Sequence, residues 1–334
     1  MPKNAPQPQK PIFFPPAPDE PRLQFLTSFS SSDDLEQTSS AFRKFIVGVE
    51  SHSRPIVKPY GVAVYNNKIY VCDTVHNAID ILDLENRKFE YFRPKEESQL
   101  LDPINLAFDE NGNMYVADSR RGQVVIMDKD GAYLGAIGKK SELKPTDVLI
   151  KNEFVYVCDL KSQTVKIFGL KDRQFISSIP AEGATEDAKL FSPTNIAMDE
   201  EGNLYVSDTG AFRVQKYNSK GEFIMSIGSH GDALGQFARP KGIAVDKEGR
   251  VYVVDAAFEN VQIFDKDGKL LLFFAEPGGS SVSLVLPAGI TIDYSLNDYF
   301  SPLIDPGFKV EYLVFVTSQY GDRKVSVFGF GHKK

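Results

Sequence analysis

Short apolar segments alternate with polar turn clusters along most of the chain. The clearest stretch is Arg239 to Leu271, where runs rich in Val, Ile, Tyr and Phe are separated by clusters of Asp, Lys and Gly. Runs of this length and composition predict antiparallel strands joined by tight turns. One set of such strands cannot bury its own faces, so the stretch requires neighbours of the same kind.

The same pattern occurs six times. Each copy begins with a proline before its first strand, at intervals of 42 to 48 residues: Pro59, Pro103, Pro145, Pro193, Pro240 and Pro287. In five copies the second strand ends on an aspartate, and in the sixth on Ser318: Asp73, Asp118, Asp159, Asp208 and Asp255. Four-stranded repeats with a period in the forties are typical of propeller blades. The sequence therefore predicts an all-β, six-bladed β-propeller.

The two ends of the repeat region complement each other. Phe25 to Phe29 align with the fourth strand of the fourth copy, although no strand precedes them. The sixth copy stops one strand short, after Val325 to Phe328. We therefore predict that the N-terminal strand, within residues 22–30, completes the C-terminal blade. Closing the ring in this way removes an unpaired sheet edge.

The remaining segments flank this ring, which we expect to span residues 22–330. Residues 1–21 contain eight prolines and are predicted to be an extended tether. Residues 31–58 connect to the first blade, and the sequence from Asp33 through Leu35, Phe42, Phe45 and Ile46 predicts a short capping helix there. Residues 331–334 form a tail.

Charge and hydropathy narrow the range of partners. The chain of 334 residues carries 38 Lys and Arg against 45 Asp and Glu, a net charge of −7. An acidic chain of this kind argues against nucleic acid as a partner. No apolar run approaches the roughly 18 residues of a membrane helix, so no transmembrane segment is expected. We expect a monomer that binds a protein or a cell-envelope partner.

Three oxygen-bearing side chains occupy equivalent positions near the predicted channel mouth. The second residue after the anchor proline is Asn105, Asp147 and Asn195 in three successive copies. Such oxygens suit a hard cation such as Ca²⁺, or another small ligand. The alternative is that they hydrogen-bond to neighbouring first strands or to water in the channel.

Two surfaces are candidates for binding a partner. Strand alternation places a group of basic and aromatic residues on one face of the ring: Arg120, Arg121, Arg213, Lys241 and Phe258. Arginine and aromatic residues are favoured where surfaces bind. The opposite face carries a long insertion, Tyr294 to Lys309, whose Tyr299 and Phe300 either pack onto the propeller or contact a partner.

The repeats resemble NHL repeats, and the chain is similar to bacterial six-bladed NHL propellers over roughly Leu23 to Phe330. The resemblance rests on openings such as Pro240 to Asp246 and on the Tyr-Val-X-Asp strand ends. Pro15 to Arg22 is similar to the linker of predicted bacterial lipoproteins, although their lipobox cysteine is not in this sequence. The resemblance implies an extracytoplasmic location, through a lipidated N-terminus missing here; a cytoplasmic location stays open.

The resemblance implies a non-catalytic binding or scaffold propeller, since NHL propellers commonly serve as interaction modules. The alternative is a calcium-dependent lactonase or esterase, because gluconolactonase-like propellers hold calcium at the channel mouth with Glu, Asn and Asp. No glutamate here matches that ligand. Amidating lyases of related fold hold zinc with three histidines, and only His76 lies in a turn where such a ligand is expected. We therefore expect no catalytic residues, no metal site and no cofactor.

Overall fold

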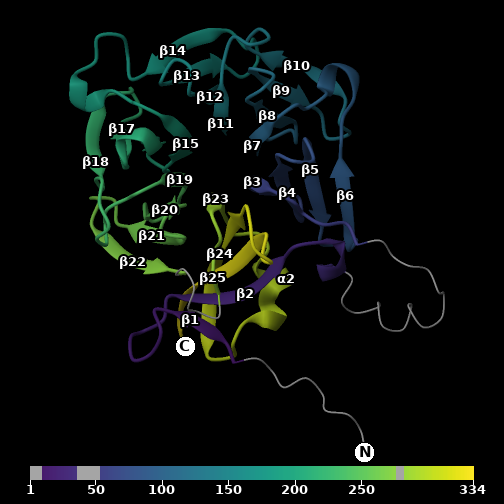
Figure 1. Ribbon diagram of the computed structural model, residues 1–334, viewed down its shortest axis with the longest axis vertical. Coiled ribbons are helices and arrows are strands. Elements are labelled where there is room, and N and C mark those ends of the chain that lie inside the picture. Colours follow the sequence, from purple (N-terminus) through teal and green to yellow (C-terminus); the bar gives the residue numbers. More distant parts are fainter. Residues whose placement is uncertain (1–9, 36–52, 276–281) are drawn as a thin grey trace, which may run out of the picture.

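The computed structural model describes residues 10–35, 53–275 and 282–334. In these residues six antiparallel sheets stand in a ring around a central opening, as predicted (Figure 1). The first five blades follow the chain in order: β3 (Pro59–Tyr65) to β6 (Lys88–Phe92), β7 (Pro103–Phe108) to β10 (Tyr133–Ile137), β11 (Pro145–Lys151) to β14 (Phe175–Ile179), β15 (Pro193–Met198) to β18 (Phe223–Ile227), and β19 (Pro240–Val245) to β22 (Leu270–Phe274). Each blade begins at its anchor proline.

The N-terminal strand closes the ring, as predicted. The sixth blade has the strand order β1-β2-β25-β24-β23, from β23 (Pro287–Asp293), β24 (Phe308–Ser318), β25 (Val325–Lys333) and β2 (Leu23–Phe29). β2 pairs antiparallel with β25, from Leu23 opposite Phe330 to Phe29 opposite Val325. In Figure 1 the purple N-terminal strands lie against the yellow C-terminal ones.

The prediction of a plain tether over residues 1–21 is wrong for residues 12–14. Strand β1 (Ile12–Phe14) pairs with β2 and adds a fifth strand to the closing blade. Phe14 is only 8% exposed, and its ring lies 6.2 Å from those of Phe274 and Phe328. Burial of this aromatic side chain between two blades explains why the segment leaves the solvent.

The hydrophobic core lies between neighbouring blades. One cluster joins Tyr115 and Ile126 of the second blade to Val148 and Val155 of the third. Because each pair of blades shares such a cluster, the blades form one continuous core. Within the described residues, none of the helices has the length and apolar character that crossing a membrane requires.

The aspartates that end the second strands fasten each blade to the segments around it. Asp255 is fully buried, and its Oδ2 accepts a 2.8 Å hydrogen bond from the Ala238 N–H in the preceding connector. Its Oδ1 accepts a 2.9 Å bond from the Ala257 N–H in the following turn. Asp73, Asp118, Asp159 and Asp208 likewise accept N–H groups of the connectors before their blades.

The long insertion of the sixth blade packs onto the ring. It contains α2 (Asn297–Phe300) and the 3₁₀ turn η5 (Ser301–Leu303). Phe300 is 1% exposed, with its ring 6.4 Å from Phe29 and 6.1 Å from Phe315. The prediction that Phe300 contacts a partner is therefore wrong, because its ring fills the core; Tyr299 is 42% exposed.

The predicted capping helix is represented by a short 3₁₀ turn, η1 (Ser32–Asp34), in which Ser31 accepts the Asp33 N–H. Phe42, Phe45 and Ile46 lie outside the described residues.

Candidate functional site

The first strands of all six blades line a central cavity of about 310 Å³. Its walls are mostly aliphatic, from residues such as Val62, Leu106 and Ile243. The polar side chains of this lining are Asn105, Asp147, Asn195 and Thr291. The six strands converge there because each is the edge strand of its sheet on the inner side of the ring.

The structure brings the three predicted oxygen-bearing residues together. Asn105 Nδ2 donates a 2.7 Å hydrogen bond to Asp147 Oδ1, and Asn195 Nδ2 lies 3.4 Å from Asp147 Oδ2. Asp147 also accepts the backbone N–H groups of Val148 at 2.8 Å and Ile196 at 2.9 Å. Asp147 therefore joins the first strands of the second, third and fourth blades.

This arrangement explains why small residues occupy the same position elsewhere. A Cβ atom on Gly61 would overlap the side chain of Asn105, so the first blade leaves room for the amide of the second. A Cβ atom on Gly242 would likewise meet the backbone of Ala288, Gly289 and Ile290. The glycines therefore permit the close approach of neighbouring first strands at the channel.

The oxygens at this position fit a hydrogen-bond network better than a calcium site. Burial raises the pKa of Asp147 to about 7, against the effect of its four N–H donors. Both carboxylate oxygens are already occupied as acceptors, and Asn105 Oδ1 accepts the Leu106 N–H at 2.9 Å. Asn195 Oδ1 is buried without a partner. A cation here would have to displace N–H donors, so we derive no chemistry through calcium.

A group of cationic side chains surrounds one mouth of the channel. Lys241 donates from Nζ to the Tyr60 hydroxyl at 2.7 Å, and the same ammonium lies 4.9 Å from the Tyr60 ring centroid. Burial, together with the smaller effects of the Arg239 and Lys58 charges, lowers the pKa of Lys241 to about 8. The Lys58 ammonium lies 5.8 Å from the ring centroid of Tyr320.

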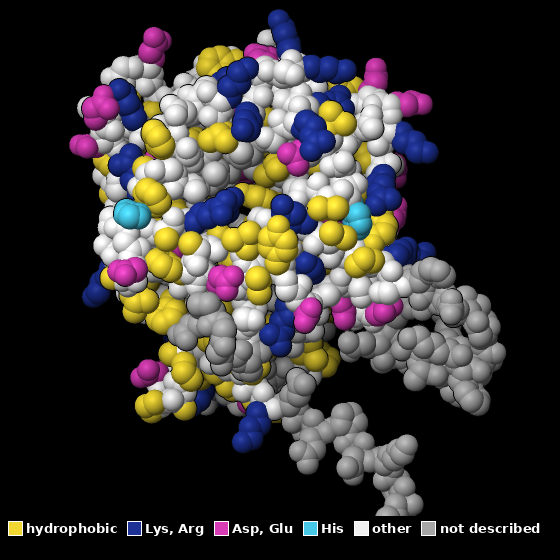
Figure 2. Space-filling view, in the orientation of Figure 1, with side chains coloured by type: hydrophobic (Ala, Val, Ile, Leu, Met, Phe, Trp, Pro, Cys, Tyr) yellow, Lys and Arg dark blue, Asp and Glu magenta, His cyan; other side chains and the backbone are white. Residues whose placement is uncertain are grey.

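These cations have no carboxylate within ion-pair distance among the described residues. Among the described residues, none of the ion pairs includes Lys58, Arg120, Lys144, Arg239 or Lys241. Burial raises the pKa of Asp102, and the positive charges of Arg120, Lys58 and Lys144 partly offset that rise. Figure 2, which looks along the ring axis, shows Lys and Arg side chains around the central opening beside hydrophobic ones. We call Lys58, Lys144, Arg239 and Lys241, together with Arg120, the cationic mouth.

Two of the predicted partner-binding arginines are held by the ring itself. Arg121 donates to Gln123 Oε1 at 2.8 Å and to the Gln99 carbonyl at 2.9 Å. Arg213 donates to the Lys189 carbonyl at 2.9 Å, and its Nε lies 3.6 Å from Asp208. These side chains fasten connectors between blades. Arg120 is exposed and Phe258 is half-buried.

Sequence reasoning did not single out Lys58, Tyr60 and Arg239 as site residues. They share a position that the sequence does reveal, since each stands directly beside an anchor proline, as Lys144 and Lys241 also do. Aligning the six copies on that proline would have shown four cations clustered at one strand end.

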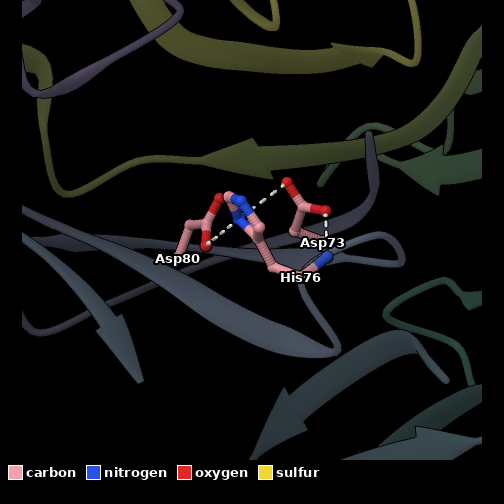
Figure 3. Close-up of side chains that lie close together, drawn as sticks. All are labelled: Asp73, His76 and Asp80. Atoms are coloured by element: carbon pink, nitrogen blue, oxygen red, sulfur yellow. Dashed lines mark hydrogen bonds and ion pairs between the residues drawn. The ribbon is translucent and has the colours of Figure 1, made fainter. Parts of the chain in front are cut away.

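His76 does not meet a second histidine among the described residues. It lies instead beside Asp73 and Asp80 in the first blade, where the three side chains point toward one another (Figure 3). His52 is outside the described residues. The predicted absence of a three-histidine site stays a prediction.

The match to a known repeat lies in the fifth blade. The family model for the NHL repeat matches residues 237–264, which run from the last connector residues through β21 (Asn260–Phe264). Residues 237–264 form an NHL repeat. No curated protein matches the sequence.

Solved structures share the propeller fold with this chain. A gluconolactonase from Xanthomonas campestris has 15% identity and a TM-score of 0.57, over 93% of this chain and 95% of that one. An inactive virginiamycin B lyase from Staphylococcus aureus has 12% identity and a TM-score of 0.55, over 82% and 96%. A structural-genomics protein from Bacteroides thetaiotaomicron has 17% identity and a TM-score of 0.59, over 83% and 70%. At these identities the likeness extends to the fold alone.

Proposed function

We propose that this propeller is a non-catalytic binding module that docks an acidic protein or cell-envelope partner on the cationic mouth. The observation that carries the proposal is the cluster of Lys58, Arg239 and Lys241, which lie close enough to depress the Lys241 pKa and form no ion pair among the described residues. Like charges held together destabilise the free protein. An anionic partner would relieve that repulsion on binding.

The surroundings of these charges favour recognition over simple solubility. The chain is acidic overall, so a local excess of positive charge runs against its net sign. Tyr60 and Tyr320 provide aromatic surface next to the cations, and Tyr320 is 52% exposed. Aromatic and cationic groups together are typical of the central part of binding surfaces. An extracytoplasmic location remains part of this proposal, on the resemblance of the N-terminal segment.

A polyanion probe tests the proposal without knowledge of the natural partner. We would measure the affinity of fluorescently labelled poly-glutamate by anisotropy, at increasing salt. The double variant Lys58→Glu/Arg239→Glu should lose at least about tenfold in affinity, or roughly 1.4 kcal/mol. Binding by the unchanged protein should weaken as salt approaches 1 M, where screening acts over about 3 Å.

The matched control is Lys129→Glu/Lys220→Glu, which makes the same change of net charge in exposed turns between third and fourth strands. It should bind like the unchanged protein. Equal losses in both double variants, or no binding of the probe at all, would contradict docking at the cationic mouth. A screen with lactone and ester substrates runs in parallel, since turnover that requires calcium and disappears in Asp147→Ala would favour the hydrolase alternative instead.

A further inference from the structure

The first blade places one carboxylate against another. Asp73 ends β4 (Lys68–Asp73), Asp80 lies in β5 (Ala78–Asp83), and His76 is in the turn between them (Figure 3). His76 Nδ1 lies 3.4 Å from Asp73 Oδ2 and 3.7 Å from Asp80 Oδ1. One potential ligand atom from each residue lies within 4.8 Å of the others.

Three polar atoms in this cluster are buried without a hydrogen-bond partner: both carboxylate oxygens of Asp80, and Nδ1 of His76. The Asp80 side chain is fully buried. An isolated buried carboxylate is costly unless a cation or hydrogen-bond donors compensate it. Burial and the neighbouring Asp73 carboxylate raise the pKa of Asp80 to about 9.

Three other blades have a cation or a hydrogen-bonded amide at this position, whereas the second has Val125 and the sixth Ser326. In the third blade the residue equivalent to Asp80 is Lys166, whose ammonium lies 3.1 Å from the strand-end carboxylate of Asp159. In the fourth and fifth blades it is Gln215 and Gln262, whose amides donate to connector carbonyls at 2.6 Å and 2.8 Å. The first blade therefore has a carboxyl group where the third has an ammonium group.

We propose that Asp80, His76 and Asp73 bind a divalent metal ion of the zinc class. Zinc takes imidazole nitrogen and carboxylate oxygen at about 2.0–2.2 Å in tetrahedral geometry, which puts neighbouring ligand atoms roughly 3.4 Å apart. The separations from His76 Nδ1 match that value closely. The metal would supply the positive charge that Lys166 supplies in the third blade.

The ligands differ in how freely they can bind. Asp73 is the most occupied of the three ligands, because its Oδ2 already accepts the N–H groups of Val57 and Lys58 and its Oδ1 those of Val75 and His76. Asp80 has both oxygens free for a bidentate contact. The His76 side chain is 17% exposed, so the cluster lies near the surface although its three unpartnered atoms are themselves buried.

Contacts with neighbouring aromatic side chains hold the His76 ring in place. The ring of Tyr91 meets that of His76 edge-on, with centroids 4.5 Å apart, and the Tyr91 hydroxyl donates to the Pro55 carbonyl at 2.7 Å. Arg93 stacks on Tyr91 at 4.9 Å and does not pair with Asp80 among the described residues. The metal would thus connect the β4–β5 turn to the connector before the first blade.

The test measures binding of Zn²⁺ to the full chain after removal of metals with EDTA, by calorimetry. We expect about one ion per chain and a higher melting temperature with Zn²⁺. Asp80→Asn and His76→Gln should each weaken binding by at least about tenfold, since even changes behind a ligand cost 10–100-fold. With Co²⁺ in place of Zn²⁺, the unchanged protein should give visible absorption bands that both variants lose.

Two further variants keep the result decisive. His332→Gln removes a histidine that also contacts a carboxylate, Glu311 at 2.8 Å, and should leave Zn²⁺ binding unchanged. Asp80→Lys imitates the third blade and should abolish Zn²⁺ binding while the protein stays folded without metal. No binding by the unchanged protein, or equal binding in Asp80→Asn, would overturn the proposal. Loss of binding only in His332→Gln would overturn it too.

Discussion

Lys241 in β19 and Tyr60 in β3 meet across the mouth of the channel, with Nζ and the hydroxyl 2.7 Å apart. They belong to the fifth and first blades, and the sixth blade lies between them in the ring. The contact holds an ammonium group in a place where burial and two other cations oppose its charge. Its charge state therefore depends on pH within a range that experiments can reach.

Titration of Lys241 should change stability above neutral pH. Its folded pKa is about 8, below the roughly 10.4 of an unfolded lysine, so the unfolded chain binds more protons between these values. The free energy of unfolding should therefore rise with pH in that window, by about 1 to 3 kcal/mol, and Lys241→Met should remove this rise. Urea denaturation of both proteins at several pH values measures the difference.

The same titration bears on docking. Loss of the Lys241 charge above about pH 8 should weaken binding of an anionic probe, while Lys241→Met should bind weakly at every pH. A pH dependence identical in both proteins would show that another group is responsible.

Truncation of the N-terminus should act in two steps. Deletion through Lys10 should leave the melting temperature unchanged, whereas deletion through Phe14 should lower it, because the buried Phe14 ring is lost. Truncation of a buried phenylalanine typically costs about 3–5 kcal/mol, and Phe14→Ala alone should approach the lower value. Deletion through Phe29 should prevent a closed ring, since β25 would lose its partner. Thermal unfolding of the three truncations distinguishes these steps, and equal melting of all three would contradict the closure.

Alanine substitutions of Phe300 and Tyr299, a core and a surface residue of the insertion, should differ strongly in their effect on stability. Phe300→Ala should destabilise the protein by about 3–5 kcal/mol, because the ring is fully buried between Phe29 and Phe315. Tyr299→Ala should change stability by less than about 0.5 kcal/mol, as surface substitutions usually do. Denaturant titration of the two variants gives both values, and similar losses would indicate that the insertion packs differently.

Asp147→Ala should destabilise the protein severely. Four N–H donors would lose their acceptor, two of them backbone groups, and each unsatisfied buried group costs about 1–3 kcal/mol. Asp147→Asn offers a milder comparison, since an amide oxygen still accepts on one side. Chemical denaturation in the presence and absence of Ca²⁺ measures the effect; a large stabilisation of the unchanged protein by Ca²⁺ would contradict the network described here.

The blades and their closure could be predicted because they leave local signals. The anchor prolines, the Tyr-Val-X-Asp strand ends and the unmatched strand near Phe25 are all visible in the sequence. β1 left no such signal, because three apolar residues among prolines show no alternation. Its pairing depends on the free edge of β2, which exists only once the ring has closed.

Site residues could be predicted from the sequence where they share one position of the repeat. They could not be predicted where one blade differs from the others at that position. Asn105, Asp147 and Asn195 share one repeat position, so their proximity followed from the blade count. Their hydrogen-bond directions did not, because these depend on the side-chain geometry of three blades. Asp80 looks like an ordinary strand residue in the sequence, and only the register with Lys166 in another blade shows that its charge is unusual.

Because strands from the two ends of the chain close the ring, the sixth blade can fold only at the end of synthesis. β2 leaves the ribosome about 300 residues before β25, its partner, so at roughly 5–20 residues per second it waits on the order of 15 to 60 s. During that time an apolar strand has an open edge and nothing to pair with. Five blades can form in the meantime, each from neighbouring strands, while the sixth depends on the last segment made. A nascent chain that stalls before Val325 therefore carries a nearly complete ring with two unpaired strand edges. At this stage we expect the chain to depend on a chaperone more than at any later stage of folding.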